Sequence, residues 1–255
     1  MRTFVMSDAH GYPELIQNAL DHGGFRPGED GFVYAGDLLD RGPDSQGCID
    51  LVERCATEVL LGNHELAVLL DFFIYPQDAE SLACRPVMID KVLNSAPGSE
   101  WKAATCVEGV LISHAGASSR FEDMFRGECH GDPVLLAEHL NQVFLAAVRA
   151  ELETGEWEED GILGEDGPLW FRPRPYSDLL PAAGVRQVVG HTPPLPELEE
   201  VGFHMVDPCA FLCMDDSGRF RYAVIEDGQV RVEEGTLERA TVGDPIDDLA
   251  VAVCR

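Results

Sequence analysis

The sequence predicts a layered α/β fold, and three observations support this. Short apolar runs alternate with segments of helical spacing from residue 1 to about 115. Polar residues and glycines follow the apolar runs, at the position where open α/β sheets place ligand sites. The chain has 255 residues with 45% hydrophobic content, enough to bury a sizeable core. We therefore expect a single domain over residues 1–255.

The order of patterns along the chain predicts the following elements. Strands are expected at 4–7, 32–35, 59–61 and 107–113, and helices at 14–20, 48–55 and 66–73. Asp132-Pro133 is typical of a helix start, and the apolar residues from 136 to 152 recur with a period of 3.6. Because an acidic, glycine-containing stretch follows, we predict a helical insertion at 117–168. Later strands are expected at 185–189, 203–206, 211–214, 219–225 and 230–233, with hairpin turns at 215–218 and 226–228.

The charge balance limits the partners that the chain can have. It contains 18 Lys and Arg residues against 46 Asp and Glu residues, a formal net charge of −28. Such a protein repels polyanions, so we expect no nucleic-acid polymer as a partner.

No apolar stretch approaches the ~18–20 residues that a membrane helix needs, so no membrane partner is expected. The eight cysteines are scattered without a C-x-x-C pair, which together with the lack of a secretion-type N-terminal run predicts a cytoplasmic protein with reduced thiols.

Residues that can bind a metal follow five of the expected strands. They are Asp8 and His10, then Asp37, then Asn63, then His114, and finally His191. Mixed carboxylate and imidazole ligands suit Mn²⁺, Fe²⁺ or Zn²⁺. Six protein ligands are too many for one ion with an open position, but they suit two ions ~3.5–4 Å apart that share a carboxylate and a water molecule. Such a pair of ions activates the bridging water for attack on a phosphoryl group, and no G-x-S-x-G nucleophile motif is present.

These residues belong to motifs with a recognisable order. D-x-H at 8–10, G-D-x-x-D-R-G at 36–42, G-N-H-E at 62–65, H-A-G at 114–116 and G-H-T at 190–192 resemble the calcineurin-like metallophosphoesterases. The resemblance is to their phosphoprotein phosphatase branch, which is related to bacterial diadenosine tetraphosphatases. G-D-x-x-D-R-G followed by G-N-H-E is highly specific, whereas D-x-H or G-H-T alone would fit an ordinary polar turn. The resemblance implies a β-sandwich flanked by helices, with a helical insertion.

The resemblance also implies a set of metal ligands. Six residues would bind two divalent ions, with Mn²⁺ expected and Fe or Zn as alternatives: Asp8, His10, Asp37, Asn63, His114 and His191. Asp37 would bridge the two ions. Many members of the wider superfamily carry a second histidine in a G-H-x-H motif, but Thr192 and Pro193 follow His191 here. The first ion would therefore keep more water.

Four further residues would act on the substrate. The resemblance implies that Asp40 holds His64 protonated, and that His64 donates a proton to the departing alkoxide. Arg41 would bind the non-bridging phosphate oxygens, because its planar fork makes paired hydrogen bonds. Arg172, in the Trp-Phe-Arg element at 170–172, would be a second phosphate ligand, although Arg174 competes for this position. Glu65 is expected to support its turn rather than to bind metal.

Three functions remain open from the sequence. The leading one is a dinuclear metal-dependent phosphatase that uses a metal-bridging hydroxide on phosphate monoesters, with a phosphorylated protein or a small phosphoester as substrate. The alternative is a bis(5'-nucleosyl)-tetraphosphatase or another nucleotide pyrophosphohydrolase, for which the 117–168 segment offers few aromatic residues and no evident stacking pair. A third is an inactive scaffold that retains metal, which the presence of Asp40 and His64 disfavours.

Overall fold

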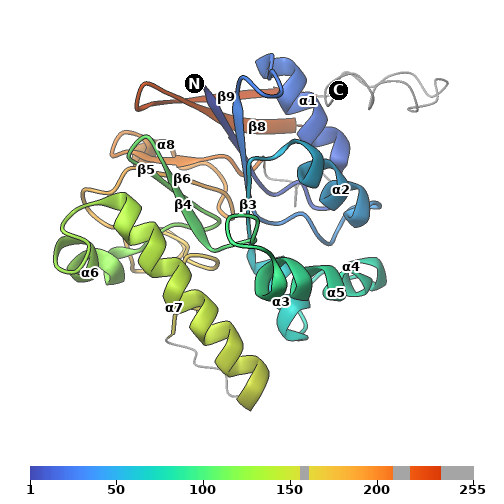
Figure 1. Ribbon diagram of the computed structural model, residues 1–255. Helices are drawn as coiled ribbons and strands as arrows, with labels where there is room; N and C mark the ends of the chain where they lie inside the picture. Colours follow the sequence, from blue (N-terminus) through green and yellow to red (C-terminus); the bar gives the residue numbers. More distant parts are fainter. Residues whose placement is uncertain (156–160, 209–218, 237–255) are drawn as a thin grey trace.

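The computed structural model describes residues 1–155, 161–208 and 219–236, and it contains two β-sheets (Figure 1). The five-stranded sheet has the order β3-β2-β1-β8-β9, with β1 Thr3–Met6, β2 Gly31–Ala35, β3 Glu58–Leu60, β8 Arg219–Glu226 and β9 Gln229–Thr236. The four-stranded sheet has the order β4-β5-β6-β7, with β4 Ala104–Val107, β5 Val110–Ser113, β6 Gln187–Val189 and β7 Phe203–Met205. Strands β1, β2 and β3 are parallel to one another, as are β5, β6 and β7.

The two sheets pack face to face around an apolar layer. Side chains alternate along a strand, so Val5 of β1 joins this inner layer while Phe4 and Met6 join the larger core on the other face. Both sheets contribute to the inner layer: Val5, Val33, Ala35, Leu60, Val110, Ile112, Val188, Val206, Ala223 and Ile225. The fold class is therefore a helix-flanked β-sandwich, as expected.

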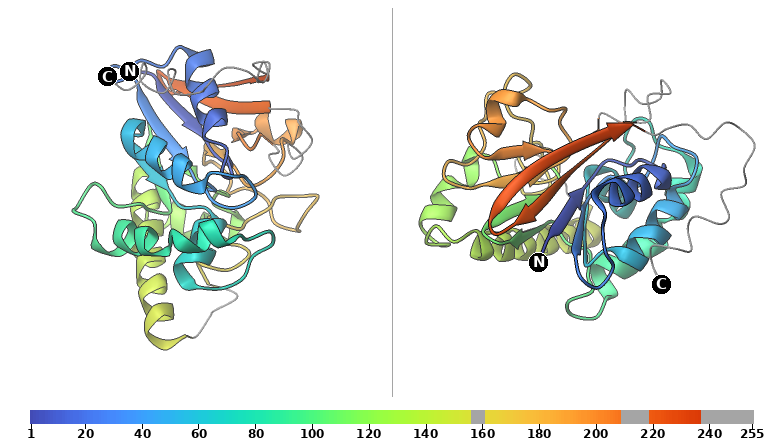
Figure 2. Two further views of the ribbon diagram at one scale, coloured as in Figure 1. Left: turned by 90° about the vertical axis from the view of Figure 1, so that its right-hand side faces the viewer. Right: turned by 90° about the horizontal axis from the view of Figure 1, so that it is seen from above.

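Helices cover the outer faces of the sandwich (Figure 2). Helices α1 (Pro13–Gly23) and α2 (Ser45–Cys55) pack in the core formed with the outer face of the five-stranded sheet. Helix α7 (Pro133–Thr154) packs on β4 and β5. The remaining helical segments are α3 Asn63–Leu70, α4 Ala79–Ala83, α5 Arg85–Ile89, the π-helix Asp90–Asn94, the 3₁₀ helix Ser119–Phe121, α6 Glu122–Arg126 and α8 Pro196–Glu199.

Most expected elements are present, and the differences have physical causes. The single strand expected at 107–113 is wrong: β4 and β5 form a hairpin whose turn uses left-handed backbone at Glu108 and Gly109. Residues 104–106 were missed because their sequence, Ala-Thr-Cys, is a weak strand signal. The helical segments between 79 and 94 were also missed. The expected strand at 211–214 and turn at 215–218 lie outside the described residues, and the turn at 226–228 joins β8 to β9 as expected.

Two further properties of the described residues bear on the expectations. None of their helices combines the length and the apolar character needed to cross a membrane. Five of the cysteines, at positions 48, 55, 84, 106 and 129, are free thiols. Helices α6 and α7 fall inside the 117–168 segment, while its status as an insertion in a single domain stays a prediction.

Candidate metal centre

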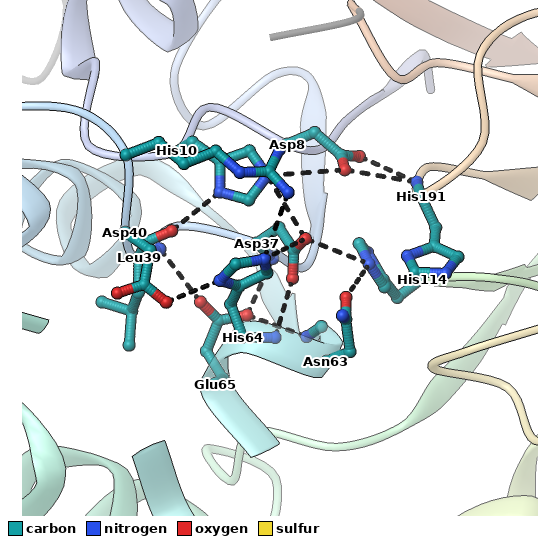
Figure 3. A network of polar contacts seen from close by, with 12 residues as sticks. Asp8, His10, Asp37, Leu39, Asp40, Asn63, His64, Glu65, His114 and His191 are labelled. Atoms are coloured by element: carbon teal, nitrogen blue, oxygen red, sulfur yellow. Dashed lines mark hydrogen bonds and ion pairs between the residues drawn. The ribbon is translucent and has the colours of Figure 1, made fainter. Parts of the chain in front are cut away.

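The six candidate metal ligands lie close together (Figure 3), and each follows the end of a strand. β1, β2 and β3 of the five-stranded sheet lead directly into the segments carrying the first four, and β5 and β6 of the other sheet lead into the last two. Each has 5% of its surface exposed or less: Asp8, His10, Asp37, Asn63, His114 and His191. Buried titratable groups are costly unless they share protons or bind a cation, so this cluster is a candidate ligand site.

The carboxylate of Asp37 is at the centre of the cluster. Its Oδ2 lies 3.4 Å from Nε2 of His10 and 3.4 Å from Nε2 of His114, which come from different sheets. The same oxygen is 4.0 Å from Nε2 of His64, and Oδ1 accepts the backbone N–H of His64 at 3.1 Å. Asp37 is therefore the one member of this cluster with imidazoles on both sides, as a bridging ligand requires.

Backbone carbonyls fix the orientation of three imidazoles. One nitrogen of each ring is paired with a carbonyl oxygen: His10 Nδ1 with Leu39 at 2.7 Å, His114 Nδ1 with Ala35 at 2.9 Å, and His191 Nε2 with Trp170 at 3.1 Å. A carbonyl can only accept, so each of these nitrogens carries a hydrogen and the other nitrogen of the ring faces the cluster. Metal-binding histidines are commonly oriented by such hydrogen bonds.

The backbone is strained at the residues that bring these side chains together. Of the ten non-glycine residues with positive φ in the described part of the chain, six lie here, with φ between 45° and 72°: Asp8, His10, Asp37, Asp40, Arg41 and His191. Such conformations cost energy and tend to cluster at functional sites. Glycines allow the close packing: a Cβ on Gly62 would lie 2.0 Å from Oδ1 of Asp37, and one on Gly190 would lie 2.1 Å from Oδ2 of Asp8.

The amide oxygen of Asn63 points toward the carboxylate and the imidazoles of the cluster. Its side-chain oxygen lies 3.1 Å from His114 Nε2 and also faces two acceptors, Asp37 Oδ2 at 3.2 Å and His191 Nδ1 at 3.3 Å. Rotating the amide would turn its NH₂ group toward the same atoms. A cation would satisfy the amide oxygen, the carboxylate and the ring lone pairs together.

The pKa values within the cluster follow from burial and from the neighbouring charges. Burial and repulsion from Asp37 raise the pKa of Asp8 to about 6. Burial lowers the pKa of His114, but attraction to the carboxylates outweighs it and raises this pKa to about 9. Burial holds the pKa values of His10 and His191 well below the usual range, so these rings are neutral and offer lone pairs. Without metal, the His114 proton supplies positive charge to Asp37, and a divalent ion would replace that proton.

The donor set fits metal ions. The buried Nε2 of His10 has no hydrogen-bond partner among the described residues, and it is aimed at Asp37. Two groups in the described part of the chain have ligand atoms within 4.8 Å of one another, namely His10, Asp37 and His64, and Asp37, His114 and His191. Both groups contain Asp37, so two cations would share this residue.

The first of these groups contains His64, whereas the motifs assign Asp8. Nδ1 of His64 lies 2.5 Å from Oδ2 of Asp40, and its Nε2 lies 3.3 Å from a guanidinium nitrogen of Arg41. A cation at that nitrogen would be repelled by the arginine. Asp8 lies 4.0 Å from His10 Nε2, and the backbone N–H of His191 holds its carboxylate at 3.0 Å. Asp8 therefore fits a cation beside His10 and Asp37 better than His64 does.

Glu65 organises the centre without entering it. Its two carboxylate oxygens are buried and accept four backbone N–H groups: Asp37 at 2.7 Å, Leu38 at 2.9 Å, Leu39 at 3.1 Å and Gly62 at 2.8 Å. Burial and the charge of Asp37 raise the pKa of Glu65. This clamp ties the loop after β2 to the start of α3, and so fixes the backbone of Asp37. The structure thus places Glu65 where the sequence predicted, in support of its turn.

Arg172 contacts a member of the cluster. The Arg172 guanidinium donates to the backbone oxygen of His191 at 2.6 Å, and its side chain is partly buried. Arg174 is exposed. Sequence reasoning missed the backbone carbonyls that orient the imidazoles, because a carbonyl carries no signal in residue type. It also missed Ser45, Asp78 and Ser81, which surround Asp40.

Fold and centre together define a metallohydrolase built on an α/β sandwich, and comparison with known proteins identifies its family. The model of the calcineurin-like phosphoesterase family matches residues 1–216. The chain therefore belongs to this family, whose members hydrolyse phosphoric esters with two metal ions.

Two curated relatives differ in what they are named for. The chain is 39% identical over 66 residues to "Serine/threonine-protein phosphatase 1" of Salmonella typhimurium, which covers 26% of this chain and 31% of the relative. It is 28% identical over 160 residues to the symmetrical bis(5'-nucleosyl)-tetraphosphatase of Enterobacter sp.. This second match covers 60% of this chain and 56% of the relative. The matches thus span from just under a third to just over half of the length of these relatives.

Solved structures with the same fold have equally varied names. A cold-active protein tyrosine phosphatase is similar with a TM-score of 0.60 and 20% identity, over 91% of this chain and 78% of the other. A protein serine/threonine phosphatase from Saccharomyces cerevisiae has a TM-score of 0.57 and 14% identity, over 95% and 82%. A putative diadenosine tetraphosphatase has a TM-score of 0.54 and 19% identity, over 92% and 93%. At these identities the similarity establishes the fold alone.

Proposed function

We propose that this protein is a dinuclear metal-dependent phosphatase acting on phosphate monoesters, with phosphoserine or phosphothreonine in proteins as the leading substrate. The observation that carries the proposal is the position of Asp37, 3.4 Å from imidazoles of two different sheets. Two divalent ions, Mn²⁺ first and Fe or Zn as alternatives, would supply charge for the phosphoryl oxygens and activate water near neutral pH. Their ligands would be Asp8, His10, Asp37, Asn63, His114 and His191.

Arg41 and Arg172 would bind the phosphate. Arg41 places a guanidinium nitrogen 3.3 Å from His64, directly beside the centre. Arg172 is anchored to the backbone of His191, so its guanidinium is held at the edge of the same cluster. A guanidinium makes paired hydrogen bonds with phosphate oxygens, which orients the phosphoryl group and offsets its charge. The exposure of Arg174 supports Arg172 for this position.

His64 would supply the proton for the leaving group. Its Nδ1 is held by Asp40 at 2.5 Å, so Nε2 is the nitrogen that faces the site. When the P–O bond breaks, its electron pair remains on the leaving oxygen, and that oxygen takes the proton from Nε2. A serine or threonine alkoxide is a poor leaving group, so this proton transfer matters most for such substrates.

The second candidate is a dinucleoside polyphosphate hydrolase, and a pair of aromatic rings favours it. The ring of Trp170 lies 6.3 Å from that of His191 and 6.4 Å from that of Phe72, at interplanar angles of 83° and 30°. Nucleobases stack on such rings. The aromatic surface comes from the loop after α3 and from the Trp-Phe-Arg element rather than from the 117–168 segment.

We further infer one domain over 1–255 with its insertion at 117–168, and a cytoplasmic location, which fits the scattered cysteines.

Three substrates test the proposal directly. After metal removal by EDTA, Mn²⁺ should restore hydrolysis of p-nitrophenyl phosphate and of a phosphoserine peptide, and Asp37→Ala should abolish both. Asp21→Ala, which removes an exposed carboxylate from α1, is the matched control and should leave kcat/KM unchanged. A kcat/KM for diadenosine tetraphosphate well above that for the peptide would select the second candidate. Hydrolysis that persists in Asp37→Ala would refute the bridging assignment.

A further inference from the structure

Asp40 is held by side chains from a part of the chain that contains none of the family motifs. It is fully buried and has a φ of 68°, in the left-handed region. Its backbone N–H lies 2.8 Å from the hydroxyl oxygen of Ser81 and 3.2 Å from that of Ser45. The two hydroxyl oxygens are 3.1 Å apart, and both serines are fully buried. The strained backbone of Asp40 is thus tied to the start of α2 and to α4.

The same α4 segment also binds the carboxylate of Asp40. The backbone N–H of Asp78 donates to Oδ1 of Asp40 at 3.3 Å, while Oδ2 is bound to Nδ1 of His64 at 2.5 Å. Asp78 in turn caps α4, because its Oδ1 accepts the backbone N–H of Ser81 at 2.8 Å. The carboxylate of Asp40 is therefore fixed on one side by the cap of α4, and the other side holds the imidazole.

We propose that Ser81, supported by Ser45, is a positioning residue that holds the Asp40–His64 pair in the geometry for proton donation. The proposal rests on the phosphatase function proposed above. Ser81 makes and breaks no bond in the reaction: its hydroxyl fixes the Asp40 backbone, Asp40 fixes the His64 ring, and Nε2 of His64 gives its proton to the leaving oxygen. Proton-transfer efficiency depends on distance and alignment, so a looser pair transfers the proton less well.

A purely structural serine would have a different signature. If Ser81 only satisfied a buried N–H group, its loss would weaken the fold and reduce the rate for every substrate alike. If Ser81 positions the acid, the fall in rate after removal of its hydroxyl should depend on how much the leaving oxygen needs a proton. An alkoxide from phosphoserine needs it strongly, whereas p-nitrophenolate leaves readily without it. The ratio of the two rates separates these possibilities.

The experiment compares Ser81→Ala with the wild type on a phosphoserine peptide and on p-nitrophenyl phosphate, both with saturating Mn²⁺. We expect kcat for the peptide to fall about 10-fold and kcat for p-nitrophenyl phosphate to fall less than about 2-fold, with both KM values unchanged. Metal affinity, measured by titration calorimetry, should also be unchanged. Ser118→Ala is the matched control, because it removes another buried hydroxyl, one that donates to the backbone oxygen of Asp166 at 3.1 Å.

Each outcome supports or overturns the inference. An equal loss on both substrates, or no loss on either, would overturn it and leave the proposed function standing. A wild-type enzyme inert toward both substrates would instead refute the proposed phosphatase function. Should Ser81→Ala fail to fold, Ser45→Ala carries the same comparison through its 3.2 Å contact with the Asp40 backbone, with a smaller but equally selective loss expected.

Discussion

The two sides of Asp37 are held in place by different means. On the metal side, backbone carbonyls orient His10, His114 and His191; two of these carbonyls lie at the end of β2 or in the loop after it, and the third lies in the segment between α7 and β6. On the acid side, His64 is oriented by the side chain of Asp40, which itself depends on Ser45 and the α4 segment. The metal side is thus built mostly by the strand ends, whereas the acid side depends on a short helical segment outside the sheets.

This difference predicts that the two sides can be separated by mutation. His64→Gln should leave the metal content at the wild-type value, because carbonyl-oriented ligands do not depend on it. Loss of the general acid should lower kcat for a phosphoserine peptide by about 10²–10⁴-fold. Metal analysis and steady-state kinetics check both parts, with His22→Gln, at an exposed histidine of α1, as the matched control. A His64 variant that loses metal would place this residue among the ligands.

The metal side should also leave a signature in the stability of the metal-free protein. The folded-state pKa of His114 is raised to about 9, against 6.5 as its ordinary value. A raised histidine pKa stabilises the fold fully below pH 6.5, and this contribution is lost as pH rises through 9. From His114 alone, we expect the free energy of unfolding in EDTA to fall by about 2 kcal/mol between pH 7 and pH 9.

Urea denaturation at the two pH values measures this fall. The lowered pKa values of His10 and His191 change the free energy of unfolding only below pH 6.5, which is outside the range from pH 7 to pH 9. His114→Gln should reduce this fall, and the part that remains belongs to the four thiols with raised pKa values, at positions 48, 84, 106 and 129, which the unfolded chain ionises as pH approaches 9. A metal-free protein of equal stability at both values would contradict the proton-for-metal exchange inferred for His114.

Glu65 links the two sides, and its removal should affect stability and metal binding together. Glu65→Gln replaces an oxygen that accepts backbone N–H groups with a donor facing them. Because hydrogen bonds to a buried charge are among the strongest, we expect a loss of about 2 kcal/mol in the free energy of unfolding. Metal affinity should fall about 10–100-fold, as for other changes around metal ligands. Urea denaturation and calorimetric titration with Mn²⁺ test this, with Glu29→Gln on the surface as control.

The smallest expected effect concerns the phosphate-binding edge of the centre. Arg172→Ala should raise KM for p-nitrophenyl phosphate about 10-fold, which corresponds to about 1.4 kcal/mol of binding energy. Arg174→Ala should change KM less than about 2-fold, because this side chain is exposed and the anchoring contact to His191 belongs to Arg172. Steady-state kinetics on both variants decide between the two arginines, and the reverse order of effects would reassign the phosphate contact.

The same contrast explains how much the sequence could predict. The metal side was predictable because apolar runs mark the strands, and polar residues after them must meet where the strands end. The acid side was only partly predictable: Asp40 and His64 belong to motifs, but Ser45, Asp78 and Ser81 have ordinary residue types and reach Asp40 only through the fold. Residues 79–94 were not recognised as helical because their short segments lack a sustained 3.6-residue period.

The measurement that tests the central claim most directly is the metal content of the purified protein after loading with Mn²⁺ and removal of excess metal. We predict two ions per chain in the wild type, one in His10→Ala, and two in the control variant His22→Ala. A wild-type protein that binds a single ion, or a His10→Ala variant that still binds two, would contradict the assignment of Asp37 as a carboxylate shared between two metal sites.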